Sequence, residues 1–238
     1  MAVVSHHKCA GKANYGRSRE TLTRVEEASR NQPVGLDLYP YRASSTVLSM
    51  ERVTGADSVI VTGSAGHPEV AGRTLDDIAR SWQCSVEEAV ERLHPAGAVY
   101  FSMDEADVER IMAYEKTMIG SDGLPSMDHP HPRLWGTFPR VLGYYVRKRR
   151  IISLEQAVRK MTGLSAETFG LHGRGILAPG NVADIVVFDP DTVRDKATFE
   201  APRQRSEGIV DVFVAGCPVW EGGLPTSGRP GRFLSRGH

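Results

Sequence analysis

The stretch Ile119-Gly120-Ser121-Asp122-Gly123-Leu124-Pro125, followed by His129-Pro130-His131-Pro132-Arg133-Leu134-Trp135-Gly136, is the most informative part of the sequence. A short apolar run that favours a β-strand, Thr117-Met118-Ile119, ends abruptly in a carboxylate and a glycine turn. This pattern places Asp122 at the carboxyl end of a strand, where α/β folds hold their reactive groups.

A second apolar run, Val3-Val4, also ends in polar residues, in this case Ser5-His6-His7-Lys8. A histidine and an aspartate at the ends of different strands are a common way to assemble a metal site, so His6 and Asp122 are candidate metal ligands. Taken singly, each has a plainer interpretation. Asp122 alone could be a cap or turn residue, and the histidine pair alone could lie on the surface.

The composition excludes several classes of protein. The chain has 238 residues, and its 29 Lys and Arg balance its 29 Asp and Glu, which gives no electrostatic reason to expect nucleic acid or an anionic membrane as a partner. No apolar run approaches the roughly 18 residues of a membrane span, and the opening run is too short for a signal peptide. We therefore expect a cytoplasmic protein. Three widely spaced cysteines, Cys9, Cys84 and Cys217, argue against a disulfide framework.

The first half of the chain alternates between strand-like and helix-like segments. Strands are expected at 3–4, 34–39, 98–101 and 117–121, and helices at 18–30, 74–82, 85–93 and 104–114. Such βαβ alternation predicts a parallel sheet covered by helices. The Ser/Thr-rich segment after Pro40 suggests a loop, and the region 52–68 is compatible with either a loop or a peripheral pair of strands.

Beyond Asp122 the pattern changes twice. Helices are expected at 138–148 and 154–161. From about Gly173 the helical pattern stops, and strands at 183–190, 209–214 and 217–220 follow, with a hairpin turn at Ala215-Gly216. These segments predict a small antiparallel module at the end of the chain.

The composite of these motifs resembles the metal-dependent amidohydrolase superfamily, and within it the D-aminoacylases, also called N-acyl-D-amino-acid deacylases. Pro179-Gly180-Asn181-Val182-Ala183-Asp184 is typical of the whole superfamily, whereas Ser5-His6-His7-Lys8, Leu36-Asp37-Leu38-Tyr39-Pro40-Tyr41, the Asp122 stretch and His131-Pro132-Arg133-Leu134-Trp135-Gly136 carry the narrower resemblance. The resemblance implies an α/β fold: the carboxyl-terminal half of a TIM-like (β/α) barrel over residues 1–172, then strands of a small β-sandwich domain over 173–238.

The resemblance also implies roles for individual residues. His6 would be a zinc ligand. Asp122 would be both a ligand and the group that accepts a proton from the metal-bound water and passes it to the leaving amine. Arg133 and Tyr100 would hold the substrate carboxylate, with Ser45 as a weaker candidate, because a guanidinium pairs with both carboxylate oxygens. Tyr39 would point toward the scissile carbonyl.

The departure from the family pattern is as informative as the match. The family's amino-terminal small-domain strands, its His-x-His pair, its bridging cysteine and its fifth-strand histidine have no counterpart in this sequence. A single histidine and a single aspartate are too few for a tetrahedral zinc site, which needs three or four protein ligands. His7, His129 and His131 are further candidates.

The sequence leaves three interpretations open. In the first, the chain is part of a zinc-dependent hydrolase that cleaves the amide of N-acyl-D-amino acids, and a missing amino-terminal half completes the site. The second is a catalytically silent remnant or structural subunit. The third is an amidohydrolase that acts on cyclic amides or dipeptides, although cyclic amides lack the carboxylate that Arg133 would hold.

Overall fold

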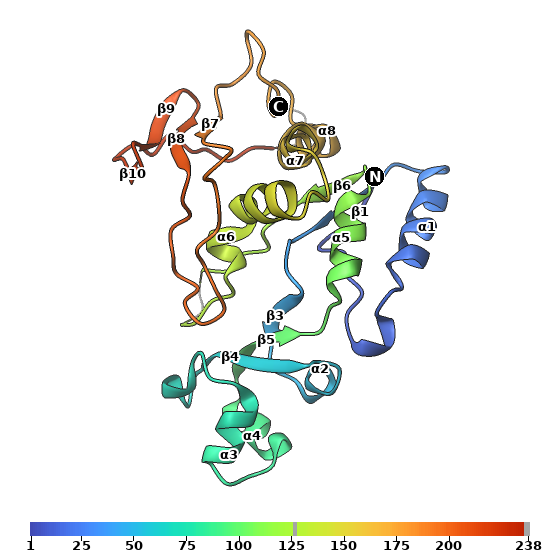
Figure 1. The fold of residues 1–238 in the computed structure, drawn as a ribbon, viewed down its shortest axis with the longest axis vertical. Coiled ribbons are helices and arrows are strands. Elements are labelled where there is room, and N and C mark those ends of the chain that lie inside the picture. Colours follow the sequence, from blue (N-terminus) through green and yellow to red (C-terminus); the bar gives the residue numbers. More distant parts are fainter. Residues whose placement is uncertain (126–127, 236–238) are drawn as a thin grey trace.

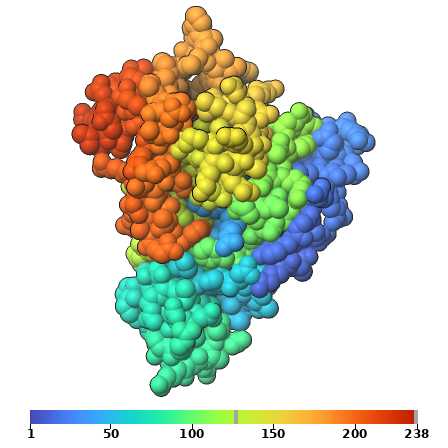
Figure 2. All heavy atoms as spheres, in the orientation of Figure 1, coloured from blue at the N-terminus to red at the C-terminus, as the bar shows by residue number. Residues whose placement is uncertain are grey.

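The computed structural model describes residues 1–125 and 128–235, and its strands form three separate sheets (Figure 1). A parallel sheet lies at the centre. An antiparallel module built from residues 43–101 extends from one end of the molecule, and a second antiparallel sheet, formed late in the chain, lies at the other end. Figure 2 shows the first module, in cyan and teal, projecting from the main body.

The central sheet is parallel, as the sequence predicts. It contains β1 (Ala2–Val4), β2 (Val34–Leu38) and β6 (Thr117–Ile119), in the order β1-β2-β6. The helices α1 (Ser18–Ser29), α5 (Glu105–Ala113), α7 (Leu154–Met161) and α8 (Gly163–Phe169) pack against these strands or one another. Parallel strands need long crossover connections, and the helical segments between them supply these. The carboxyl ends of all three strands therefore meet at one edge.

The expected strand at 98–101 exists, but its place in the parallel sheet was predicted wrongly. This strand, β5 (Ala96–Phe101), lies between β3 (Ala43–Val47) and β4 (Ser58–Ser64) and pairs antiparallel with both. The reason is a separate apolar core, in which Val61 of β4 packs with Ile78 and Leu93, which lie outside the sheet. The same module contains α2 (Met50–Thr54), η2 (Pro68–Val70), α3 (Leu75–Ser81) and α4 (Val86–Leu93).

Two segments that the sequence left as loops or unresolved are regular in the structure. The Ser/Thr-rich segment expected to be a loop is the strand β3, and the region 52–68 contains the end of α2 and the strand β4. Ser and Thr form a strand here because β5 offers a full antiparallel ladder on that side. A short 3₁₀-helix at Lys12–Asn14 completes the connection from β1 to α1.

The helix expected at 138–148 begins earlier and changes type. It consists of α6 (Arg133–Arg140) and a π-helical segment, Val141–Lys148. Pro139 lies inside α6 and has no N–H to give to the carbonyl of Trp135, which instead accepts a hydrogen bond from the Ser206 hydroxyl. The lost helical hydrogen bond precedes the change to wider turns.

The last sheet is antiparallel, as predicted. Its strands are β7 (Ile185–Phe188), β8 (Ile209–Val214), β9 (Cys217–Glu221) and β10 (Leu224–Pro225), in the order β10-β9-β8-β7. Ala215 and Gly216 join β8 to β9, and both have positive φ angles, as a tight hairpin turn requires.

Residues 190–201 leave this last sheet and pack back on the main body. Val193 is buried in the same core as Leu38 and Tyr145, and the Phe199 ring contacts the rings of Tyr41 and Phe101. In Figure 2 the orange surface of this segment lies against the yellow helices. The proposed boundary between residues 172 and 173 stays a prediction, and residues 236–238 of the expected second unit lie outside the described residues.

None of the helices within 1–125 and 128–235 combines the length and the apolar character that crossing a bilayer requires.

Candidate active site at the carboxyl ends of the parallel strands

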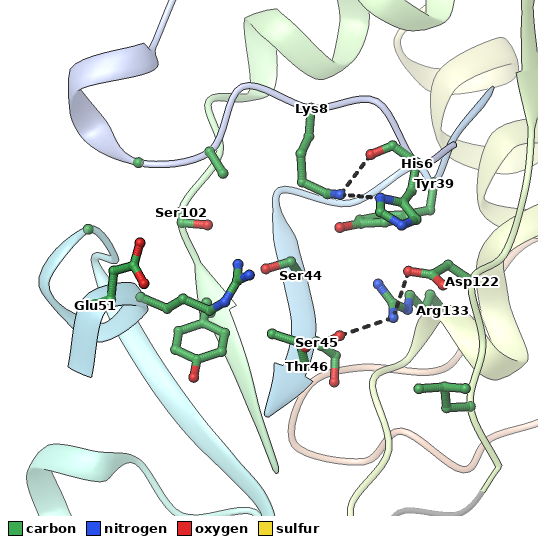
Figure 3. Close-up of a pocket in the computed structure, with 16 residues that line it drawn as sticks. His6, Lys8, Tyr39, Ser44, Ser45, Thr46, Glu51, Ser102, Asp122 and Arg133 are labelled. Atoms are coloured by element: carbon green, nitrogen blue, oxygen red, sulfur yellow. Dashed lines mark hydrogen bonds and ion pairs between the residues drawn. The ribbon is translucent and has the colours of Figure 1, made fainter. Parts of the chain in front are cut away.

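A cavity of about 460 Å³ opens where the carboxyl ends of the parallel strands face the antiparallel module (Figure 3). All six site residues predicted from the sequence line it, although they are spread over 128 positions of the chain: His6, Tyr39, Ser45, Tyr100, Asp122 and Arg133. His6, Tyr39 and Asp122 follow β1, β2 and β6, Ser45 and Tyr100 lie on β3 and β5, and Arg133 begins α6. The structure thus brings the predicted residues together.

Both candidate metal ligands sit in a backbone conformation that favours glycine. The φ angles of His6 and Asp122 are +42° and +49°, and they are two of five non-glycine residues with positive φ in the described chain. Such strain persists only where surrounding contacts hold it, and it is concentrated at functional sites. For His6, Asp37 is that contact, because its Oδ1 accepts the His6 N–H at 2.9 Å and its carbonyl accepts the His7 N–H at 2.7 Å.

Gly123 lets the Asp122 loop approach the helix that carries Arg133. A Cβ atom at this position would lie 2.9 Å from the Cα of Leu134, so any larger residue would push the loop away from α6. The Asp-Gly pair in the sequence is therefore a steric requirement of the site.

Arg133 is the most deeply buried charge of the cavity, with 2% of its side chain exposed. Its Nη2 lies 2.9 Å from Asp122 Oδ2 and donates to the Ser45 carbonyl at 3.4 Å, and its guanidinium stacks over the Tyr39 ring at 4.6 Å. Its Nε and Nη1 have no hydrogen-bond partner among the described residues. A buried guanidinium with unused donors is costly unless a ligand accepts them.

Tyr39 adds a neutral donor next to this guanidinium. Its hydroxyl is buried and has no hydrogen-bond partner among the described residues. Burial raises the pKa of Tyr39, so the hydroxyl keeps its proton and can donate it to an anion.

Tyr100 lines the cavity, and its hydroxyl is hydrogen-bonded to the backbone. Its hydroxyl donates to the Val47 carbonyl at 2.8 Å and accepts the Ser49 N–H at 2.9 Å. Because its proton is already engaged by the backbone, the side chain forms a wall of the cavity and holds the loop between β3 and α2.

Lys8 is a cavity residue to which the sequence motif gave no role. Its Nζ donates to the His6 carbonyl and contacts His6 Nδ1, both at 2.7 Å (Figure 3). Burial lowers the pKa of Lys8 to about 8, with Asp122 opposing this shift and Arg133 and Arg52 adding to it. The only sequence signal for a role of Lys8 at the site was its position two residues after His6. The other lining residues not predicted from sequence include Ser44, Thr46, Glu51, Arg52 and Ser102.

The further metal ligands considered from the sequence do not converge on the cavity. The Nε2 atoms of His7, His129 and His131 contact the Thr21 hydroxyl, the Phe199 carbonyl and the Ala43 carbonyl, respectively. Within residues 1–125 and 128–235 no three His, Cys, Asp or Glu side chains form a group that could hold a metal ion. His6 and Asp122 are suitable zinc ligands in type, but two are too few.

Comparison with known proteins identifies the family. The protein-family model described as "Amidohydrolase family" matches residues 61–220 of the sequence. The chain is 55% identical over 234 residues to a D-aminoacylase of Alcaligenes xylosoxydans xylosoxydans, in a match that covers 98% of this chain and 48% of the relative. The chain belongs to the amidohydrolase family.

Two solved structures show how this amidohydrolase folds. A D-aminoacylase crystal structure matches with a TM-score of 0.95 at 54% identity, over 98% of this chain and 49% of that one. N-acyl-D-glutamate deacylase from Bordetella bronchiseptica, complexed with zinc and a phosphonate mimic of the tetrahedral intermediate, matches with a TM-score of 0.90 at 51% identity, over 94% and 48% of the two chains. The predicted fold, a partial barrel followed by part of a β domain, is confirmed. This amidohydrolase spans about half the length of the relatives it matches.

Proposed function

We propose that this amidohydrolase chain is the substrate-carboxylate-binding half of a zinc-dependent enzyme that hydrolyses N-acyl-D-amino acids to a carboxylate and a D-amino acid. The observation that carries the proposal is the buried Arg133, which has two unused donor groups directly beside Asp122. The relatives named D-aminoacylase and N-acyl-D-glutamate deacylase support the same substrate class.

In this proposal Arg133 binds the carboxylate of the substrate. Its Nε and Nη1 have no partner among the described residues, so each can donate to a substrate oxygen, although the two N–H groups lie on different edges of the guanidinium. The Tyr39 hydroxyl would donate from the same side of the cavity, and Ser45, on β3, also lines it. A cyclic amide without a carboxylate would leave these donors unsatisfied, which disfavours that alternative.

Asp122 handles the proton in this proposal. One of its oxygens, Oδ2, pairs with Arg133, so Oδ1 can hold a proton and then give it to the leaving amine. Zinc, when bound at such a site, supplies Lewis-acid activation of water near neutral pH. His6 and Asp122 would be this chain's share of the ligands, and the rest would come from elsewhere.

The missing part of the site would come from an amino-terminal half. Both β1 and β6 lie at edges of the parallel sheet, and a parallel sheet with open edges is unusual because such sheets are normally buried or closed into a barrel. A second exposed surface is an apolar groove of about 590 Å³ between α6, α7 and β7. We assign both surfaces to contacts with the half of the relatives that this chain does not match.

Hydrolysis of matched enantiomers tests the proposal. This chain is mixed with the unmatched half of the Alcaligenes D-aminoacylase and zinc, and release of the free amino acid is measured on N-acetyl-D- and N-acetyl-L-methionine and on the two glutamates. We expect release from the D compounds only, and a loss of about 100-fold or more in the Asp122→Asn variant. Equal rates on both enantiomers, or full activity in Asp122→Asn, would contradict the proposal. If the two halves form a complex but no amino acid is released, the interpretation as a catalytically inactive remnant would be favoured.

A further inference from the structure

His131 lies two residues before Arg133 and is almost completely buried, with 4% of its surface exposed. It does not line the cavity, and its ring nitrogens point to the backbone rather than to a metal or substrate. A buried histidine with two defined hydrogen bonds needs an explanation other than chemistry at the cavity.

The two hydrogen bonds define which ring nitrogen carries the proton. The backbone N–H of Arg133 can only donate, and it points at His131 Nδ1 over 2.9 Å, so Nδ1 is the acceptor. The Ala43 carbonyl can only accept, and it lies 3.0 Å from Nε2, so Nε2 carries the hydrogen. The ring is therefore neutral and is the Nε2–H tautomer.

These bonds connect the two elements that carry the proposed carboxylate site. The Arg133 N–H belongs to the first turn of α6, where backbone donors have no partner within the helix. Ala43 begins β3, the strand on which Ser45 lies two residues later. The imidazole is thus a direct link between the start of α6 and β3, the two elements that carry Arg133 and Ser45.

The surroundings hold the ring in place. The rings of Tyr41 and Phe199 approach it edge-on with centroids 5.0 Å away, and the Tyr39 ring lies at 6.3 Å. Burial, reinforced by the charge of Arg133, lowers the pKa of His131 well below its ordinary value, which agrees with a neutral ring.

We propose that His131 is a positioning residue: as the Nε2–H tautomer it links α6 to β3 and so fixes the Arg133 guanidinium relative to Ser45. The inference rests on the proposed function, because it assigns His131 to the carboxylate site of that reaction. A link that only orients a binding group should affect the affinity for carboxylate substrates more than the chemical step.

Two isosteric variants separate the two ends of the link. In His131→Asn the side-chain oxygen can replace Nδ1 as acceptor but the group cannot reach Ala43. In His131→Gln the side-chain amide can replace Nε2–H as donor, and the acceptor for Arg133 is lost. His129→Gln is the matched control, since His129 is in the same loop but its Nε2 bonds the Phe199 carbonyl and neither Arg133 nor Ala43.

Kinetics of the reconstituted enzyme on N-acetyl-D-methionine provide the first test. We expect both His131 variants to raise KM by roughly 10-fold or more with kcat changed by less than about 3-fold, and the control to change neither. An unchanged KM in both variants, or a loss confined to kcat, would overturn the proposal. A loss of bound zinc in His131→Asn and His131→Gln would also overturn it, because it would make His131 a metal ligand.

A second test does not depend on activity. Imidazole ¹⁵N NMR of this chain, with His131 assigned by the signal missing in His131→Gln, should show a protonated Nε2 and an unprotonated Nδ1 that do not titrate between about pH 5 and 8. An Nδ1–H tautomer, or titration in that range, would contradict the inference even if the deacylase reaction is confirmed. The expected spectrum without any hydrolysis would leave the tautomer and its two contacts established and place the failure in the proposed function.

Discussion

Asp107 shows how a buried carboxylate stabilises this fold at the scale of a single residue. It accepts the Gly16 N–H at 2.6 Å and the Ser18 N–H at 3.1 Å, and Arg110 lies 3.0 Å away. Burial acts to raise the pKa of Asp107, but these hydrogen bonds and the arginine charge outweigh it, so the net shift is downward. The carboxylate thereby fixes the start of α1 against α5.

We predict that Asp107→Asn lowers the free energy of unfolding at pH 7 by about 1–3 kcal/mol, because backbone donors lose a charged acceptor. Since the folded-state pKa lies below the ordinary value of about 3.9, the stabilisation is present above that pH and is lost as the pH falls through the folded-state pKa. Denaturant titrations at several pH values measure this difference. The exposed Asp191→Asn is the control, and a variant difference that does not shrink toward low pH would contradict the prediction.

Individual site residues were more predictable than their contacts. His6 and Asp122 could be found because each follows an apolar run, and Arg133 because the stretch His131-Pro132-Arg133-Leu134-Trp135-Gly136 resembles the deacylase family. The use of the Tyr100 hydroxyl by the backbone could not, because it depends on the packing of β3 against β5. Lys8 and Asp37 were missed as site residues because their partners are set by the turn after β1 and not by spacing.

At the scale of the elements, a buried lysine closes the amino-terminal end of β6. Lys160, on α7, donates to the carbonyls of Tyr114, Glu115 and Thr117 at 2.5, 3.2 and 3.2 Å. These carbonyls lie where the chain turns from α5 into β6, so one side chain satisfies three acceptors that have left the helix.

We predict that Lys160→Met destabilises the chain by about 2–3 kcal/mol, because buried carbonyls are left without donors. Chemical denaturation compares it with Lys148→Met, whose lysine is exposed and lies over the Tyr144 ring. The Lys148 change should cost less than about 1 kcal/mol. Equal effects of the two substitutions would show that the three carbonyls do not depend on Lys160.

Local signals predicted the elements well, whereas sheet membership needed tertiary information. Ser85 and Ser153 form capping boxes with Glu88 and Gln156, and each box needs only residues within one helical turn. The strand β5 was assigned to the wrong sheet because its apolar sequence fits a central strand of either type. Its partner β3 lies in a segment whose Ser and Thr content suggested a loop, and β4 lies in a region that was compatible with either a loop or a peripheral pair of strands.

At the scale of the whole molecule, large apolar side chains remain exposed around the groove between α6, α7 and β7. Ile176 and Leu177 on its rim are 65% and 81% exposed. Clustered exposed apolar residues of this kind mark interaction surfaces. Together with the open edges of the parallel sheet, they are the basis for proposing a second polypeptide half.

We predict a 1:1 complex between this chain and the unmatched half of a deacylase relative, measured by light scattering after gel filtration. Leu177→Asp should weaken association about 10-fold or more, because it places a charge in an apolar interface. Phe233→Asp is the control, since Phe233 is 92% exposed and does not line the groove. Equal binding of the two variants would exclude the groove from the interface, and self-association alone would indicate a second copy as its partner.

The most direct test of the central claim is a thermodynamic cycle in which the Arg133 guanidinium and the substrate carboxylate are removed separately and together. The reconstituted wild type and Arg133→Met are compared by kcat/KM on N-acetyl-D-methionine and on its uncharged carboxamide. Any disturbance of Asp122 by the substitution affects both substrates and cancels in the ratio. We predict a loss of about 100-fold or more on the carboxylate and less than about 10-fold on the carboxamide. Equal losses on the two substrates would contradict the assignment of Arg133 as the carboxylate-binding residue.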